Sequence, residues 1–571
     1  MEKVSKKSQK KLIFNLFDTK YEIIPHVVKQ LLFAGITLEN NDDSWDVLWT
    51  DNAVGPDRLS RMKHYQKINH FPGMYAISRK NYLAYNLNKL RKQFPDDYNF
   101  YPRTWVIPSD LGEIKNFLIL NKNSYLIVKP EASCQGRGIF LTRKFEDIDN
   151  GCKFVVQEYL SKPYLIDSLK FDLRIYVLVT GCCPLRIFVH REGLVRFATE
   201  KYVRPNGFNC WNMCMHLTNY AVNKGNPNFV YNDDVKKDFV GHKRSLKSTF
   251  LFFEKQGVDT EELWKKIEDI IIKTICSAQP ILSHHYKSCQ PDDFSNSMCF
   301  EILGFDVILD SNLTPYILEV NHTPSFTTDS PLDFSVKQTI ILEALKLLNL
   351  DSNLRKDYKK KQKIEVLRRN LTGKIEKISK EERKKFTEHC KAQRDLWERE
   401  HKNGFKKVYP TEELEKFEKF IKVADTIWQE WTGTNIHKNP IIKEKLSKTS
   451  SFITRRKQIH EKTECSEALK KLAKPKILNN QSNFPYIIYR PNKKTIVKSR
   501  GNMSCVNLFE KTIETEEKKV KRLKSEDLAH SLPKQEVKIL KPVERRGKKI
   551  SLKEILSLEC LDLKIIKFKS G

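Results

Sequence analysis

Residues 299–321 read CFEILGFDVILDSNLTPYILEVN. Two runs rich in β-branched and aromatic residues flank the polar segment 310–314, a pattern that predicts an antiparallel hairpin. Residues two apart on a strand face the same side, so Glu319 and Asn321 share a face that Asp306 can reach from the paired strand. Two carboxylates and an amide oxygen are ligands that Mg²⁺ accepts. The alternative is a pair of buried acids without a cation, in which the carboxylates would repel and at least one would need a raised pKa.

A second predicted hairpin covers residues 125–142, where two apolar runs flank the loop EASCQGRG. Gly136 and Gly138 allow the loop backbone to approach a ligand closely, so that its N–H groups can surround a phosphate. Lys129, at the end of the first run, and Arg137 would supply positive charge. By itself, a glycine-rich hairpin is more often only a turn.

Residues 170–180 read KFDLRIYVLVT and alternate between apolar and polar side chains, as expected for a strand. Phe171 and the residues in step with it would face a core. Lys170, Asp172 and Arg174 would share the other face. An Asp/Arg pair on a strand is usually a structural ion pair, but the adjoining lysine favours a nucleotide-binding cleft.

The composition describes a water-soluble protein of several domains. The 571 residues are 40% hydrophobic and 30% charged, and no segment has the roughly 18 uncharged apolar residues needed to span a bilayer. We expect no signal peptide, because the apolar run 12–17 behind the basic start is too short. The 13 cysteines are irregularly spaced and are expected to be reduced thiols. For Cys210, Cys214 and His216, a buried-thiol interpretation is favoured over a metal site.

Positive charge is concentrated in the last two-fifths of the chain. Residues 1–350 hold 45 Lys+Arg and 40 Asp+Glu, whereas residues 351–571 hold 57 and 31, and the whole chain carries a formal charge of +31. This asymmetry indicates a near-neutral folded body joined to a cationic region that meets nucleic acid, anionic lipid or an acidic protein surface. Residues 356–397 are typical of a long amphipathic helix, for which a solvated face with i,i+4 ion pairs is the simpler interpretation.

Several longer motifs resemble the tubulin tyrosine ligase-like family, in the same order along residues 12–350. They are Val128-Lys-Pro130, Gln135-Gly-Arg-Gly-Ile139, Gln157-Glu-Tyr-Leu160, Lys170-Phe-Asp-Leu-Arg174, Arg196-Phe-Ala-Thr199, His216-Leu-Thr-Asn-Tyr220 and Leu318-Glu-Val-Asn-His322. Residues 64–73 and 100–105, and the cationic segment after the body, are more similar to the polyglutamylase branch. Within that branch the chain is similar to members that lengthen glutamate chains on tubulin tails.

The resemblance implies an α+β protein with the ATP-grasp fold, in which two lobes with antiparallel sheets clamp ATP. We expect five parts, which are an N-terminal α/β domain (1–118), a central lobe (119–200), a C-terminal lobe with the Mg²⁺ site (201–350), a basic helical microtubule-binding region (351–450) and a largely disordered Lys-rich tail (451–571).

The resemblance also implies roles for individual residues. Those expected to act in catalysis are Lys129, Arg174, Arg196 and Glu319. Those expected to bind ATP are Lys129, Gln135, Gly136, Gln157, Glu158, Tyr159, Leu160, Lys170, Phe171, Asp172, Thr218 and Asn219. The expected Mg²⁺ ligands are Asp306, Glu319 and Asn321. Those expected to bind the substrate glutamate are Arg196, Tyr220, Ala221, Lys243 and His322. Ala221 stands where the family pattern has serine, and the variable stretch 225–242 makes the alignment of Lys243 less secure.

The implied reaction is ATP-dependent addition of free L-glutamate to glutamate side chains of tubulin tails, through an acyl phosphate. A ligase that adds glycine, and an inactive microtubule-binding scaffold, are the alternatives. An RNA-binding protein would show aromatic residues interleaved with Lys/Arg, whereas the C-terminal region has mainly Lys/Glu runs. We expect a cytoplasmic monomer on the cytoskeleton, in cilia, axonemes and basal bodies, that binds neither nucleic acid nor membranes.

Overall fold

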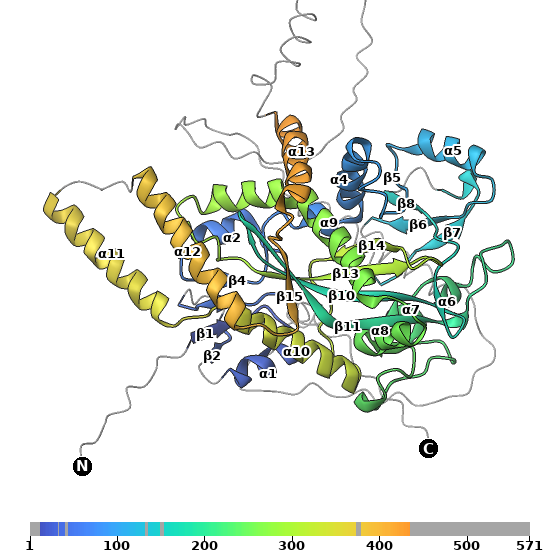
Figure 1. Cartoon of the computed structure of the whole chain (residues 1–571), viewed down its shortest axis with the longest axis horizontal. Helices are drawn as coiled ribbons and strands as arrows, with labels where there is room; N and C mark the ends of the chain where they lie inside the picture. The colour runs from blue at the N-terminus through green and yellow to red at the C-terminus, as the bar shows by residue number, and fades with distance from the viewer. Residues whose placement is uncertain are drawn as a thin grey trace, which may run out of the picture. The chain divides into compact units, whose positions relative to one another are not determined.

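The largest sheet of this computed structural model is antiparallel and follows the order β12-β11-β10-β13-β14 (Figure 1). Its strands are β10 (Leu169–Cys182), β11 (Leu185–Lys201), β12 (Lys243–Ser245), β13 (Glu301–Leu309) and β14 (Pro315–Asn321), and it is extended by β9 (Leu165–Ile166) beside β10 and β15 (Phe405–Tyr409) beside β11. The structure describes residues 12–31, 34–39, 44–131, 135–148, 153–372 and 379–433. All of these lie in the first of two units, 1–464, and the second unit, 465–571, is outside the described residues.

The predicted hairpin at 299–321 is confirmed as β13 and β14. Asp306 lies opposite Glu319, but Val307 pairs with Ile317, so Leu318 is an extra residue in a β-bulge. Such bulges redirect side chains and are common next to active sites.

The predicted hairpin at 125–142 is also confirmed, in a separate antiparallel sheet of order β5-β8-β6-β7. Its strands are β5 (Thr104–Val106), β6 (Leu126–Pro130), β7 (Phe140–Thr142) and β8 (Phe154–Glu158). A third, parallel sheet of order β2-β1-β3-β4 consists of β1 (Leu12–Asn15), β2 (Ala34–Thr37), β3 (Val47–Leu48) and β4 (Lys67–Ile68).

Both faces of the large sheet are buried. Phe171, Leu173 and Ile175 of β10 belong to the core cluster that includes α9 (Thr260–Cys289). Tyr176 and Leu178, on the opposite face, belong to a cluster that includes α10 (Pro331–Leu347). Lys170, Asp172 and Arg174 are in step with this second set, so one face of β10 changes from polar to apolar along its length. The polar half faces the candidate site described below.

Shorter helices complete the body and, with two single 3₁₀ turns, connect the sheets. They are α1 (Ile23–Gln30), α2 (Pro56–Arg61), α3 (Tyr75–Ser78), α4 (Lys80–Gln93), α5 (Leu111–Leu120), α6 (Met213–His216), α7 (Tyr220–Asn223) and α8 (Leu246–Lys255), with 3₁₀ turns at Phe145–Asp147 and Val235–Lys237. No helix among the described residues is long and apolar enough to cross a bilayer.

The strand pairing differs from the expected boundary between lobes. Residues 119–200 were expected to form one central lobe, but β10 and β11 pair with β13 and β12 in the large sheet rather than with β6 and β8. A long apolar hairpin next to a second hairpin can pair on either side, and the sequence does not state which pairing is made.

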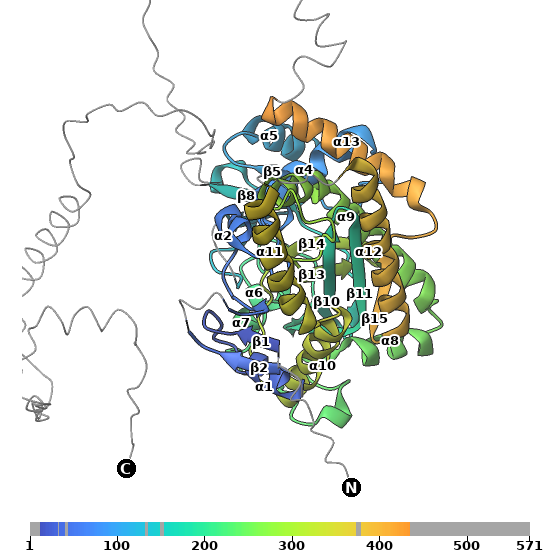
Figure 2. The ribbon, with the colours of Figure 1, turned by 90° about the vertical axis from the view of Figure 1, so that its left-hand side faces the viewer.

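The basic region is also divided differently from the expectation. In place of one long helix, α11 (Asn353–Thr372) and α12 (Lys380–Glu400) are separate helices that lie in front of the large sheet in Figure 2. The chain then returns to the body, because β15 pairs with β11 and α13 (Leu414–Thr432) packs against α9. Residues 405–432 are therefore part of the folded body, and the predicted disordered tail lies outside the described residues.

We predict that Phe420→Ala lowers the free energy of unfolding by about 3–5 kcal/mol, the range for truncating a buried aromatic residue. Phe420 of α13 is fully buried, with ring centroids 5.0 Å from Phe94 and 5.1 Å from Tyr98. Chemical denaturation would measure the change. Leu371→Ala is the matched control, because Leu371 is 85% exposed and its truncation should change the free energy of unfolding by less than about 0.5 kcal/mol. Equal effects of the two substitutions would contradict the packing of α13 on the body.

Candidate active site

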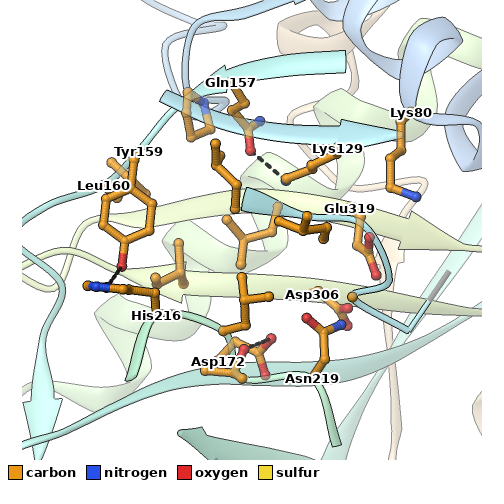
Figure 3. Close-up of a pocket in the computed structure, with 18 of the residues that line it drawn as sticks. Lys80, Lys129, Gln157, Tyr159, Leu160, Asp172, His216, Asn219, Asp306 and Glu319 are labelled. Atoms are coloured by element: carbon orange, nitrogen blue, oxygen red, sulfur yellow. Dashed lines mark hydrogen bonds between the residues drawn. The ribbon is translucent and has the colours of Figure 1, made fainter. Parts of the chain in front are cut away.

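A cleft lies between the β5-β8-β6-β7 sheet and the polar half of the large sheet (Figure 3). Eleven of the twelve residues predicted to bind nucleotide line it, and so do all three predicted metal ligands and Arg196. The structure thus brings together side chains from six strands, from the loops between them and from the start of α4.

Six predicted site residues do not line this cleft. Phe171 faces the opposite side of β10 and belongs to the hydrophobic core, as the alternation of the strand requires. Arg174 lies behind Asp306 as its ion-pair partner. The other four are residues predicted to bind the amino acid, and they are Tyr220, Ala221, Lys243 and His322.

Lys129 points into the cleft from β6. Its Nζ donates to Oε1 of Gln157 at 2.8 Å, and Nε2 of Gln157 donates to Oγ1 of Thr104 at 2.9 Å. Burial lowers the pKa of Lys129 to about 8, and the charge of Glu319 opposes this shift only in part. A buried amine of this kind gains from a phosphate, because the anion restores a favourable environment for its charged form.

Lys170 of β10 is the second buried lysine that lines the cleft. Its Nζ donates to the Tyr159 hydroxyl at 3.0 Å and to the His216 carbonyl at 2.8 Å. Burial lowers the pKa of Lys170 to about 7, although Asp172 raises it. Burial and Lys170 also lower the pKa of His216 to about 4, so its ring is neutral and Nδ1 can accept the Tyr159 proton across 3.0 Å.

A chain of alternating positive and negative side chains crosses strands β11, β10 and β13 of the large sheet. Arg196 of β11 donates to both Asp172 oxygens, at 2.8 and 2.5 Å, and its Nη2 lies 2.7 Å from Oδ2 of Asp306. Arg174 of β10 binds the same Asp306 through Nε at 2.5 Å and Nη2 at 3.0 Å. Although burial opposes ionisation, these arginines hold the pKa of Asp306 well below its usual range.

Glu319 faces Asp306 without an arginine of its own. Burial and the charge of Asp306 raise the pKa of Glu319, so the two acids are stable together only when a proton or a cation lies between them. Nδ2 of Asn321 is 3.3 Å from Oε1 of Glu319 and 3.5 Å from Oδ2 of Asp306. Two carboxylates and an amide that can turn its oxygen inward fit a hard divalent cation.

The glycine-rich loop closes one end of the cleft. Gly136 has φ +82°, and a Cβ there would lie 2.7 Å from Cγ2 of Val222 and 3.3 Å from Oδ1 of Asn219. Any side chain at this position would push the loop away from α7. The glycine is therefore required by both conformation and space.

Two notable residues that line the cleft were not identified from the sequence. Lys80, at the first turn of α4, lines the cleft beside Lys129 and Glu319, but no local pattern distinguishes it from other exposed lysines. Leu318 lines the same cleft as Glu319 because of the β-bulge, whereas strict alternation would place the two side chains on opposite faces. A bulge leaves no signal in the residue types.

We predict that Mg-ATP binding takes up protons near pH 7–8 and weakens severalfold between pH 7 and pH 9. In the free protein Lys170 and Lys129 lose their charge as the pH rises through about 7 and 8, and a bound phosphate would raise both pKa values. Titration calorimetry in two buffers of different ionisation heat measures the uptake. Lys170→Met should reduce the proton uptake, and an unchanged value in this variant would contradict the assignment.

Comparison with known proteins identifies a family and several relatives. A model of the family described as "Tubulin-tyrosine ligase family" matches residues 58–358, which is more than half of the 571 residues. A probable beta-tubulin polyglutamylase of Tetrahymena thermophila is 51% identical over 432 residues, covering 75% of this chain and 36% of that protein. Tubulin polyglutamylase TTLL6 of Mus musculus is 40% identical over 481 residues, covering 83% and 57%.

Tubulin polyglutamylase TTLL7 of Homo sapiens is 39% identical over 452 residues, covering 74% of this chain and 50% of that protein. The chain spans from about a third to less than three-fifths of the length of these three relatives. The matched segment contains both hairpins and every predicted site residue. This chain belongs to the tubulin-tyrosine ligase family.

Proposed function

We propose that this chain is an ATP-dependent ligase that adds L-glutamate to glutamate side chains of tubulin tails and lengthens existing glutamate chains. One observation carries the proposal. Across a single cleft, the buried Lys129 of the β5-β8-β6-β7 sheet faces the acid pair Asp306 and Glu319 of the large sheet, which also carries the buried Lys170 and Arg196. The relatives are named as tubulin polyglutamylases, and these names supply the class of acceptor.

ATP is the proposed occupant of the cleft, in an ATP-grasp arrangement. Its phosphates would meet Lys129 and the loop at Gln135 and Gly136, while the base would lie near Tyr159 and Leu160. The apolar side chains that line the cleft and suit a flat purine include Ile127, Ile139, Ile308 and Leu318. The neutral Tyr159–His216 pair places no unpaired charge on the base side.

Mg²⁺ is the proposed cation between Asp306, Glu319 and Asn321. Bound there, it would neutralise charge on the phosphates and orient the one that is transferred. The chain's own part is to keep Asp306 ionised through Arg174 and Arg196 and to leave Glu319 as the carboxylate that most needs a cation. Lys129 would add positive charge from the opposite sheet.

The amino-acid subsite is proposed at the edge of the cleft around Arg196. Lys243 lies opposite Arg196 in the β11–β12 register, and its ammonium is 3.9 Å from the centroid of the Tyr220 ring. Ala221 follows Tyr220 and offers a small exposed surface. His322 follows Asn321, and burial and nearby His70 lower its pKa to about 4, so it is neutral at pH 7. Two cations suit an acidic amino acid rather than glycine.

The proposed reaction has two steps. The γ-carboxylate of an acceptor glutamate attacks the γ-phosphorus of ATP, which forms an acyl phosphate and releases ADP. The amino group of free glutamate, after losing a proton, attacks the acyl carbon, and phosphate leaves as the amide bond forms. No covalent enzyme intermediate is needed, so the roles left to the side chains are positioning and charge stabilisation.

We expect the purified protein to add labelled glutamate, but neither glycine nor tyrosine, to microtubules in the presence of Mg-ATP. Mass spectrometry of the released tails reports the amino acid, the number of units and whether new branches or longer chains form. Glu319→Gln should lower the rate at least about 100-fold, since it removes a cation ligand while preserving size. Exclusive addition of glycine or tyrosine would refute the substrate assignment, and failure to hydrolyse or transfer phosphate would indicate the inactive scaffold.

The basic helices are the proposed microtubule contact. From Lys359 to Leu371, α11 is exposed on all sides, and the helix carries eight basic and two acidic residues. α12 carries seven basic and six acidic residues, so the excess positive charge lies on α11. Positive charge next to the active-site body would raise the local concentration of acidic tails. We propose that the protein acts in the cytoplasm on the cytoskeleton, including ciliary microtubules.

We predict that Lys359→Glu/Lys363→Glu weakens microtubule co-sedimentation more than Lys384→Glu/Lys385→Glu does. Lys384 lies 4.0 Å from Glu388 on the nearly neutral α12, whereas α11 carries the net charge. Both double variants should bind Mg-ATP like the wild type, because all four lysines are exposed and distant from the cleft residues. Equal sedimentation of all three proteins at modest salt would contradict this role of α11.

A further inference from the structure

Asp333 is a buried carboxylate held between two lysines in the first turn of α10. Its side chain is 1% exposed, Nζ of Lys243 donates to Oδ2 at 2.6 Å, and Nζ of Lys337 lies 3.0 Å from Oδ1. The N-cap residue Ser330 accepts the Asp333 amide and also donates its hydroxyl to Oδ2 of Asp333 at 3.2 Å, so the carboxylate contacts the helix cap as well as the two lysines. A charge this deeply buried is destabilising unless it is paired, so both lysines matter to it.

Lys243 is held from two directions. Asp333 binds its ammonium from α10, and the Tyr220 ring of α7 covers it at 3.9 Å. A free lysine has four flexible side-chain torsions, so an ammonium alone defines a position poorly. An ammonium has three protons, and the bond to Asp333 uses only one of them. The same lysine can therefore be anchored by Asp333 and still receive a second carboxylate.

Through Lys337, Asp333 is also linked to the segment that follows the β13–β14 hairpin. Lys337 donates to the carbonyl of Thr327 as well as contacting Asp333. The chain from Asn321 to Thr327 contains His322, so one carboxylate links β12, α10 and the end of β14. Because of this second link, the alternative explanation is that Asp333 has a purely structural role.

We infer that Asp333 is a positioning residue that fixes the ammonium of Lys243 where it receives a carboxylate of the incoming amino acid. The inference rests on the proposed function and goes beyond it, because Asp333 lies behind the subsite and touches neither the nucleotide cleft nor the substrate. Without the carboxylate, the ammonium groups of Lys243 and Lys337 would repel, and Lys243 would leave its place under Tyr220.

The test is a double-mutant cycle on the Michaelis constant for L-glutamate. Asp333→Asn should raise the KM for glutamate about tenfold and change the KM for ATP less than about twofold. Lys243→Ala should raise the glutamate KM by at least as much. Adding Asp333→Asn to Lys243→Ala should have little further effect, because a residue that acts through Lys243 has nothing left to position.

Glu343→Gln is the matched control, an acid-to-amide change on the same helix. Glu343 is partly buried, pairs with His190 at 3.0 Å and accepts the Gly404 amide at 2.8 Å, so its loss should lower the melting temperature and leave the glutamate KM unchanged. If Asp333→Asn instead behaves like this control, or if its effect adds fully to that of Lys243→Ala, the inference is wrong.

The two hypotheses fail in different ways. If the wild-type protein joins glycine or tyrosine instead of glutamate, the proposed substrate is wrong, and the same cycle with that amino acid still decides whether Asp333 acts through Lys243. If the wild type uses glutamate but the two substitutions are independent, only the role of Asp333 is refuted.

Discussion

The alternating ion chain Asp172–Arg196–Asp306–Arg174 joins three neighbouring strands of the large sheet, and the chemistry of the cleft depends on it. The two aspartates are buried and the two arginines are nearly so, and each of the four charges is paired with an opposite one, as charges withdrawn from water require. The two arginines stabilise Asp306 as a carboxylate. This leaves the neighbouring Glu319 as the acid whose ionisation is unfavourable, and it makes the pair receptive to a divalent cation.

The two buried lysines of the cleft are the cationic counterpart of these acids. Lys129 lies on the opposite wall, in β6, and Lys170 lies on β10 next to Asp172; burial lowers both pKa values toward neutrality more than the nearby carboxylates raise them. A bound polyanion would therefore favour the charged form of both lysines. A divalent cation bound with it would favour ionisation of the acid pair. The need for charge neutralisation is built into the two sheets before any ligand enters.

The basic region after residue 350 is joined to the folded body through α12 and β15. Arg394 of α12 is buried and donates to the carbonyls of Thr180 and Asn296, and Arg186 of β11 pairs with Glu398 at 2.7 Å. With β15 in the sheet, these contacts fix α12 to the body. The preceding helix α11, which is exposed from Lys359 to Leu371, is the proposed contact with acidic tails.

Much of the site could be predicted from the sequence alone. Period-two alternation placed Lys170, Asp172 and Arg174 on one face, and the 299–321 hairpin placed Asp306 against Glu319, because strand periodicity and turn residues are local properties. Long-range contacts decided the rest. The pairing of β10 with β13, the bulge at Leu318, the entry of Lys80 and the return of β15 and α13 to the core each depend on which distant surfaces meet. A residue type records its own preference for strand, helix or burial, but it does not record its partner, and only the tertiary structure makes that choice.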